Sequence, residues 1–270
     1  MPRLNPLDTL TAGLCVAALA AAPHTLANTV PFTETFTGGF DGDAWVDDTT
    51  DPSYDFAPNA ATDTYDVTLT NGSRSYSTVG TTGIPTTVGT VITTSTEFTL
   101  TDADTATTRI GFVLLADTAA IEGTGSDPNS IIAYISEPGG FVAPVFVVRD
   151  LDTFNDDISD PFTTLDRALT DATYRLDAIT TIVTDGIETS LTLTNLSTLE
   201  SETADLAIDT AIPTGGFVGL HTDRNGGGPA STIAFDNYSV SVSVIPEPAS
   251  AVLFAAGLGL LVRRRANRRA

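Results

Sequence analysis

The chain has 270 residues, 34 of them acidic and 12 basic, and its formal net charge at pH 7 is −22. All the basic residues are arginines and six of them lie in the terminal segments, so residues 28–245 alone carry a net charge of −26. So acidic a surface repels polyanions and excludes nucleic-acid binding, and the single cysteine, Cys15, excludes intrachain disulfides and cysteine-ligated zinc.

The N-terminal segment, residues 1–27, is typical of a secretory signal peptide. Arg3 precedes an apolar run from Leu10 to Ala22, which is too short to span a bilayer as a relaxed helix. Thr25-Leu26-Ala27 then places small residues at the positions −3 and −1 of a cleavage site before Asn28. We therefore predict a signal helix that is removed after Ala27.

The middle of the chain, residues 28–245, shows the period of two that is typical of strands with one buried face. Apolar side chains alternate with Thr, Ser or Asp in four clear runs, which are "TYDVTLT" (64–70), "RIGFVLLA" (109–116), "TSLTLTN" (189–195) and "NYSVSVSV" (237–244). The best helix candidate, "TTLDRALTDATYRL" (163–176), is short and could equally be a loop that enters a strand. The pattern predicts one all-β domain, a two-sheet antiparallel jelly-roll sandwich.

The order of these segments resembles a known superfamily. "FTETF" with the nearby Trp45 is followed by "RIGFVLLAD", by "TYRLDAITTIVTDGIETSLTLTNLSTLE", by "GGFVGLHTD" and by the closing "STIAFDNYSV". This succession, over most of residues 31–244, resembles the concanavalin A-like lectin/glucanase superfamily, in particular its laminin-G-like modules. A galactose-binding-like jelly roll, which also ends in an Asp-Asn strand, is the alternative fold.

Catalysis is not expected from the sequence. Glycoside hydrolysis needs two carboxylates at a defined separation, and the E-x-D-x-x-E-like strand pattern of the resembled glucanases is not found. A G-x-S-x-G elbow that would present a nucleophilic serine is also missing. We expect a non-catalytic protein, with a glycan hydrolase or lyase of the same fold as the alternative.

Carbohydrate binding is the function that the polar loops favour. Lectin-type sites combine an aromatic ring with amide and carboxylate groups that bond to sugar hydroxyls. Trp45 lies between acidic loops, and "HTDRNGGG" (221–228) gathers polar groups on a Gly-rich segment. The sequence therefore predicts a carbohydrate-binding site at Trp45, His221, Asp223, Arg224 and Asn225, with extracellular polysaccharide as the partner.

A structural calcium ion is a further expectation. Ca²⁺ prefers carboxylate and carbonyl oxygens, in which this chain is rich. The resemblance implies that Asp236 of the "FDN" strand pairs with the N-terminal strand around such an ion, through Glu34.

The C-terminal segment, residues 246–270, is a third region. Pro246-Glu247-Pro248 is followed by 14 mostly small or apolar residues, 249–262, and by five arginines. This succession resembles the PEP-CTERM sorting signal, in which the Pro-Glu-Pro triplet is the motif. The resemblance implies transient insertion of a short hydrophobic helix in the inner membrane and processing by an exosortase-type enzyme.

The two terminal segments agree on one topology, because a cluster of arginines favours the cytoplasmic side and the signal peptide exports the domain. We expect a protein exported through the inner membrane to the cell surface or extracellular matrix of a Gram-negative-type bacterium. Its expected role is carbohydrate binding or exopolysaccharide association. A purely structural surface protein without ligand is the remaining alternative.

Overall fold

The fold was analysed in a computed structural model of the chain. It describes residues 32–34, 36, 45–47, 55–59, 61–69, 74–79, 84–101, 108–117, 130–137, 144–150, 162–224 and 231–245. All of these except Ile245 belong to one compact unit, Thr29–Val244. The predicted signal helix and the predicted C-terminal hydrophobic helix lie outside the described residues. Within the described ranges, no helix has the length and apolar character that crossing a membrane requires.

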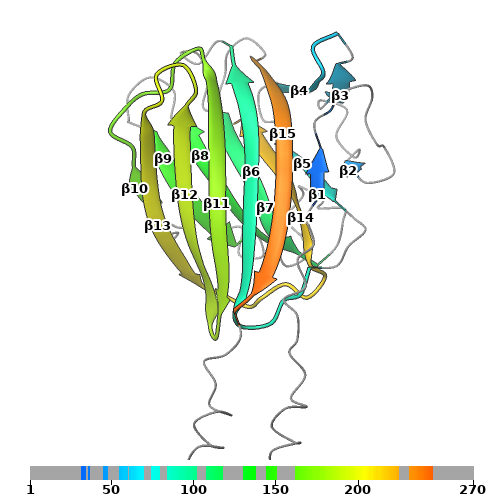
Figure 1. Ribbon diagram of the computed structural model, residues 1–270, viewed down its shortest axis with the longest axis vertical. Coiled ribbons are helices and arrows are strands. Elements are labelled where there is room, and N and C mark those ends of the chain that lie inside the picture. Colours follow the sequence, from blue (N-terminus) through cyan, green and yellow to red (C-terminus); the bar gives the residue numbers. More distant parts are fainter. Residues whose placement is uncertain are drawn as a thin grey trace, which may run out of the picture. The chain divides into compact units, whose positions relative to one another are not determined.

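Two antiparallel sheets make up this unit (Figure 1). The eight-stranded sheet has the order β13 (Ser201–Asp209), β12 (Gly186–Asn195), β11 (Thr173–Val183), β6 (Thr90–Leu100), β15 (Ser231–Val244), β4 (Thr64–Leu69) and β3 (Asp55–Asn59), and β1 (Phe32–Glu34) also pairs with β15. The seven-stranded sheet has the order β10 (Phe162–Thr164), β9 (Val145–Asp150), β8 (Ser130–Glu137), β7 (Thr108–Ala116), β14 (Phe217–Arg224), β5 (Arg74–Val79) and β2 (Trp45–Asp47). The predicted all-β two-sheet sandwich is therefore confirmed.

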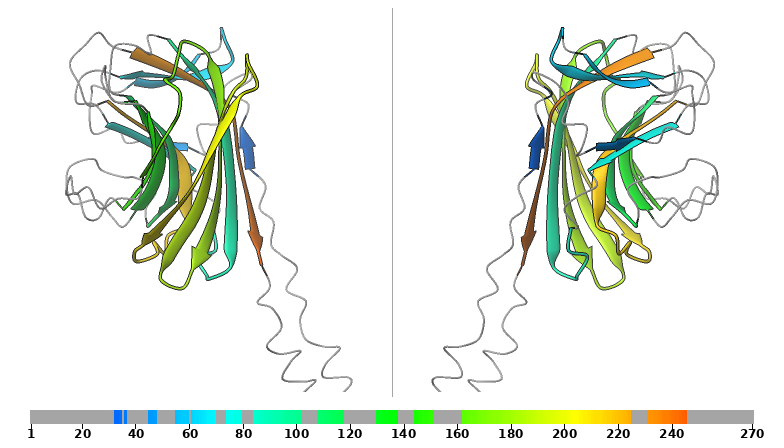
Figure 2. Two further views of the ribbon diagram at one scale, coloured as in Figure 1. Left: turned by 90° about the vertical axis from the view of Figure 1, so that its left-hand side faces the viewer. Right: turned by 90° about the vertical axis from the view of Figure 1, so that its right-hand side faces the viewer.

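The main hydrophobic core lies between the two sheets, which Figure 2 shows edge-on as two layers. Alternate side chains of each strand enter it, as the period of two predicted. Tyr65, Val67 and Leu69 of β4 have no exposed surface, and Ile110 and Phe112 of β7 are buried opposite them in the other sheet. The remaining faces of both sheets point away from this core.

The long strand β15 contains a bulge that shifts its alternation by one residue. Asp236 pairs with Glu97 of β6, yet Ser239 pairs with Ser95, so β15 holds one more residue than β6 between these two pairs. Asn237 takes up the extra length with a φ of 50°, a left-handed conformation that asparagine tolerates better than most residues. The bulge allows Phe235 and Tyr238, three residues apart, to face the core together.

Ser and Thr side chains dominate the outer face of the eight-stranded sheet, from β13 to β15. We call this surface the hydroxyl face. Neighbouring strands are linked there by side-chain hydrogen bonds between Thr99 and Thr173 (2.9 Å), Thr192 and Thr203 (2.9 Å), Thr194 and Ser201 (2.8 Å), and Ser95 and Asp177 (2.6 Å). Thr is β-branched and favours extended backbone while remaining polar, so the face is both a good strand former and hydrated.

The candidate helix at residues 163–176 is not a helix. Residues 162–164 form the short strand β10, residues 165–172 form an irregular connection, and β11 begins at Thr173. Leu165 and Leu169 are buried, with 3% and 5% of their surface exposed, so packing of two leucines holds this connection in place.

Candidate functional site

The outer face of the seven-stranded sheet carries a second, separate set of buried side chains. Strand alternation places them there, because Phe112 and Ile135 of the same strands enter the main core. The apolar members are Val113, Ala116, Ile132, Tyr134 and Val147. Burial of side chains on the face that points away from the other sheet distinguishes this surface from the hydroxyl face and makes it the candidate site.

A buried ion pair lies on this outer face. Arg109 of β7 and Asp223 of β14 are partners in register, and Arg109 Nη1 donates to Asp223 Oδ2 at 2.7 Å. The exposed fractions of the two side chains are 18% and 4%. A buried carboxylate is costly without compensating interactions, and the Arg109 guanidinium places an opposite charge beside Asp223. Of the two, Arg109 is the one that reaches solvent.

Two aromatic rings lie next to this pair. Tyr134 of β8 and His221 of β14 are both in register with Gly111 of β7, one on each side. Because Gly111 has no side chain, the two rings meet over it in an edge-on arrangement with centroids 5.5 Å apart. The Arg109 guanidinium carbon lies 5.5 Å from the centre of the Tyr134 ring, within the range of a cation–π contact.

Arg109, Tyr134, His221 and Asp223 together form what we call the outer-face cluster. It combines a guanidinium group, a carboxylate and two aromatic rings, all held by three adjacent central strands. The Nε–H group of Arg109 is shielded from solvent and donates no hydrogen bond to any residue that the structure describes. The cluster is thus rigid, and it retains a donor beyond the one that binds Asp223.

Two of the predicted carbohydrate-binding residues, His221 and Asp223, belong to this cluster. They lie within β14, which continues to Arg224, and not in the loop that the Gly-rich sequence suggested. Arg224 ends the strand, but its side chain and the whole of Asn225 lie outside the described residues. Trp45 lies in β2 and pairs with Val79 of β5, and its side chain is likewise outside the description.

Sequence reasoning missed Arg109 and Tyr134, the two members of the cluster on β7 and β8. The signal for Arg109 is present in "RIGFVLLA", because alternation places Arg109 and Gly111 on the face opposite Ile110 and Phe112. An arginine and a glycine in successive outward positions of a central strand favour a specific contact over a plain solvated surface. No comparable signal marks Tyr134, because aromatic residues are common in strands.

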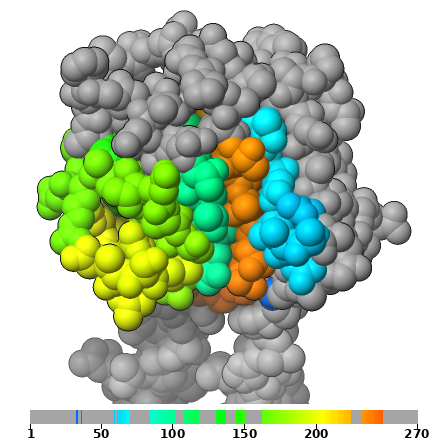
Figure 3. Space-filling model, turned by 90° about the horizontal axis from the view of Figure 1, so that it is seen from above, coloured from blue at the N-terminus to red at the C-terminus, as the bar shows by residue number. Residues whose placement is uncertain are grey.

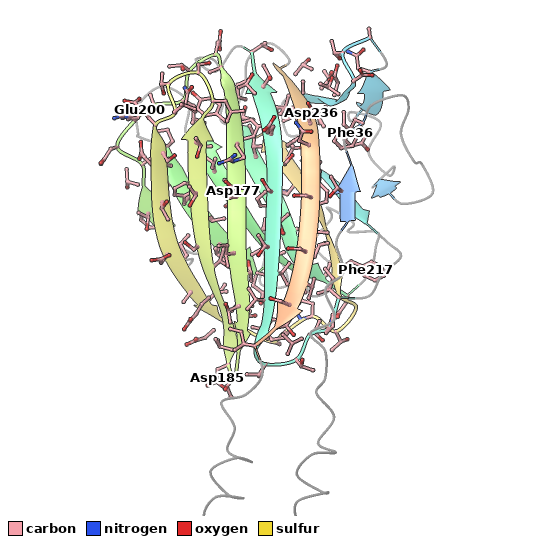
Figure 4. The ribbon with its side chains drawn as sticks, viewed as in Figure 1. Phe36, Asp177, Asp185, Glu200, Phe217 and Asp236 are labelled. Carbon is pink, nitrogen blue, oxygen red and sulfur yellow. The ribbon has the colours of Figure 1, made fainter. Side chains whose placement is uncertain are left out.

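The predicted calcium residues lie on β1 and at the bulge of β15. Glu34 pairs with Tyr238, two positions from Asp236, and its side chain is not described. The Asn237 amide donates to Glu97 Oε2 (2.9 Å) and to Asp236 Oδ2 (3.3 Å), so it bridges two carboxylates that face each other across β6 and β15. Figure 4 labels Asp236 near one end of β15.

The pKa of Asp236 is raised above its ordinary value. Partial burial is the main cause, and the nearby charges of Glu97 and Asp63 add to it, against the backbone N–H of Asn237, which lowers the pKa. Among the described residues, no three His, Cys, Asp or Glu side chains lie close enough together to hold a metal ion. The motif residues Pro246, Glu247 and Pro248 lie outside the described ranges.

Comparison with known proteins identifies the fold. No protein-family model and no curated protein sequence matches the chain. Among solved structures, the winged bean acidic lectin complexed with methyl-α-D-galactose is 10% identical, covers 81% of this chain and 100% of its own, and has a TM-score of 0.58.

Two further solved structures give the same picture. The basic winged bean lectin with Tn-antigen is 12% identical over 81% of this chain and 100% of its own, with a TM-score of 0.55. Lectin I from Ulex europaeus, in complex with the methyl glycoside of α-L-fucose, is 10% identical to this chain. The match covers 79% of this chain and 98% of the lectin, also with a TM-score of 0.55. At such identities the likeness concerns the fold, which is that of the legume lectins and hence concanavalin A-like, as the sequence predicted.

Proposed function

We propose that this β-sandwich binds carbohydrate without catalysis, and that the outer-face cluster is the floor of its binding site. The observation that carries the proposal is the Arg109–Asp223 pair with the Tyr134 ring beside it, on a sheet face that the main core does not use. Legume lectins of this fold that were solved with a galactoside and a fucoside support the carbohydrate class.

The chemistry of the cluster suits a sugar. Arg109 presents N–H donors in a fixed plane, and Asp223 on one side and the Tyr134 ring on the other hold that plane. Sugar hydroxyls accept hydrogen bonds from a guanidinium group, and Arg109 is the member of the pair that reaches solvent. Tyr134, His221 and Asp223 are almost fully buried, so their role in the proposal is to position Arg109, not to contact the sugar.

Arg109→Lys is expected to lower the affinity for a bound polysaccharide about tenfold, because lysine keeps the charge beside Asp223 but loses the planar donors. Binding is measured on a glycan array and then by calorimetry with the best polysaccharide. Arg175→Lys, at a solvent-exposed arginine of β11, is the matched control and should bind like the unchanged protein.

Three results would count against the proposal. Failure to bind any polysaccharide favours a structural surface protein, and equal affinity of the Arg109→Lys variant places binding elsewhere. Turnover of a glycan favours the hydrolase or lyase alternative.

Calcium is part of the proposal as a structural ion at Glu34 and Asp236. The donor type fits, because Asp236 and Glu97 are carboxylates on paired positions of β15 and β6, and a hard cation prefers such oxygens. Two carboxylates are fewer than the ligands that calcium takes, so Glu34 would have to contribute. The binding measurements are therefore made with calcium and with a chelator, and an unchanged melting temperature in the chelator would contradict this ion.

The cellular location of the protein is also part of the proposal. We infer that the chain is exported through the inner membrane, held there transiently by its C-terminal segment, and released to the cell surface or matrix after processing by an exosortase-type enzyme. The support is the pairing of an N-terminal signal-like segment with Pro246-Glu247-Pro248, an apolar run and five arginines.

Glu247→Ala is expected to abolish this processing, because the substitution removes the charged residue of the motif. The measurement is the size and location of the protein in its native host by immunoblotting of cell and medium fractions. Ser250→Ala, outside the motif, is the control. Normal release of the Glu247→Ala variant would contradict the exosortase proposal while leaving carbohydrate binding untouched.

A further inference from the structure

A pocket of about 220 Å³ opens where β12 turns into β13, at one end of the eight-stranded sheet. Two segments line it, residues 165–170 between β10 and β11 and residues 193–202 around the turn, together with the start of β11. Figure 3 views this end of the molecule and shows the two segments side by side, in yellow-green and yellow. Neither segment contributes to the outer-face cluster.

The floor of the pocket is apolar and fixed. Leu165, Leu169 and Leu193 line it, and each is at most 6% exposed. The ring of Tyr174 completes the floor, and its hydroxyl accepts from the backbone N–H of Thr170 (2.9 Å) and donates to the carbonyl of Thr170 (3.1 Å). The tyrosine hydroxyl is thereby satisfied within the protein, so the pocket offers a ligand the ring and not the hydroxyl.

The mouth of the pocket is charged. The Arg167 guanidinium contacts the Glu200 carboxylate, and both side chains are more than half exposed. Glu202 lies beside them and accepts from the backbone N–H of Asp166 at 2.7 Å. An exposed ion pair contributes little to the stability of the fold. Both of its side chains can therefore also form hydrogen bonds to a ligand. Since Arg167 offsets Glu200, Glu202 leaves the mouth with a net negative charge.

The turn that forms one wall is preorganised. Asn195 Oδ1 accepts from the backbone N–H groups of Ser197 (2.9 Å) and Thr198 (3.2 Å), which closes the turn. Leu199 is held with a φ of 61°, a conformation that leucine rarely adopts and that the surrounding bonds must enforce. A ligand therefore meets a wall that already has its final geometry, which reduces the entropy lost on binding.

We infer that this pocket is a second carbohydrate site, which takes one terminal hexose or hexosamine and excludes uronic acids. A pyranose has an apolar C–H face that fits the leucine and tyrosine floor, and an edge of hydroxyls that suits two carboxylates and a guanidinium. The volume lies below the usual range for larger ligands and favours a single ring over a chain. The negative mouth favours a protonated amine and repels a carboxylate.

The inference goes beyond the proposed function, because this site and the outer-face cluster share no residue. One domain with two sites could hold the end of one glycan and the side of another. A single copy of the chain would then link two polysaccharide molecules.

The test follows leucine, isoleucine and valine methyl groups by NMR in methyl-labelled protein, with glucosamine, glucose and glucuronate as probes. Glucosamine should shift the methyl signals of Leu165, Leu169 and Leu193 with a dissociation constant on the order of 1 mM. Glucose should bind more weakly and glucuronate should cause no shift. Glu202→Gln, which keeps an acceptor for the Asp166 N–H but removes the charge, should weaken glucosamine binding about tenfold.

Ala168→Trp provides the steric test, because Ala168 is exposed and lines the pocket, so a large ring there fills it without disturbing the core. Ala211→Trp, at an exposed alanine outside the pocket, is the matched control. Loss of the shifts in the first variant alone supports the site. Absence of the three leucine shifts in the unchanged protein overturns the inference, as do equal shifts with glucuronate or their persistence in Ala168→Trp. Shifts confined to Val147 and Ile132 would support the outer-face site and overturn this one.

Discussion

Gly111→Ala is expected to destabilise the fold by at least about 3 kcal/mol. A β-carbon at position 111 would lie 2.0 Å from the carbonyl oxygen of Ala133 and 2.5 Å from the Cα of Tyr134. Both are backbone atoms of the adjacent strand β8, so no side-chain rotation removes the overlap. The central strands of the seven-stranded sheet would have to separate, and the contact between Tyr134 and His221 would be lost with them.

Urea unfolding followed by circular dichroism measures this effect. Thr93→Ala, on the exposed hydroxyl face of β6, serves as the control and should stay within about 0.5 kcal/mol of the unchanged protein. A Gly111→Ala variant with near-normal stability would mean that β7 and β8 are farther apart than described. If the variant does not fold at all, Gly111→Ser should fail too, because the clash involves only the β-carbon.

Arg109→Ala is expected to cost about 3 to 5 kcal/mol, because it removes the positive charge that faces the buried Asp223 carboxylate. The pair itself need not be strongly stabilising, since two charges were removed from water to form it. Replacing both residues by apolar ones, Arg109→Met with Asp223→Leu, should therefore recover much of the loss. The double variant separates a requirement for charge balance from a requirement for arginine.

A double-mutant cycle measured by chemical unfolding checks this expectation. The single variants Arg109→Met and Asp223→Leu should each be less stable than the double variant. Purely additive losses would show that the two side chains do not interact in solution. The same double variant should not bind polysaccharide. It should therefore regain stability relative to the single variants without regaining binding.

Much of the fold was predictable because alternation is a local property. The runs around Tyr65, Ile110 and Leu191 each fix which side chains are buried without reference to any other strand. The bulge at Asn237 has a weaker local signal in "FDNYSV", because an uninterrupted period of two would place Phe235 and Tyr238 on opposite faces. The pairing with β6 shows where the extra residue lies.

The candidate site was predictable in part, for a related reason. His221 and Asp223 stood out as polar residues in an apolar strand, whereas Arg109 and Tyr134 become relevant only once β7 lies between β8 and β14. Strand order and register are long-range properties that no single segment encodes. The pocket beside Leu169 was missed because its walls are about 30 residues apart and one of them has no regular structure.

The hydroxyl face has a consequence for the behaviour of the protein in concentrated solution. Lysines are one means by which β-sheet proteins keep exposed strands from pairing with copies of themselves, and this chain has none. Charge repulsion between acidic molecules weakens as salt is added, but the hydration of Ser and Thr hydroxyls does not depend on that repulsion. Hydration of this face therefore still opposes association of the molecules when added salt has screened their charges.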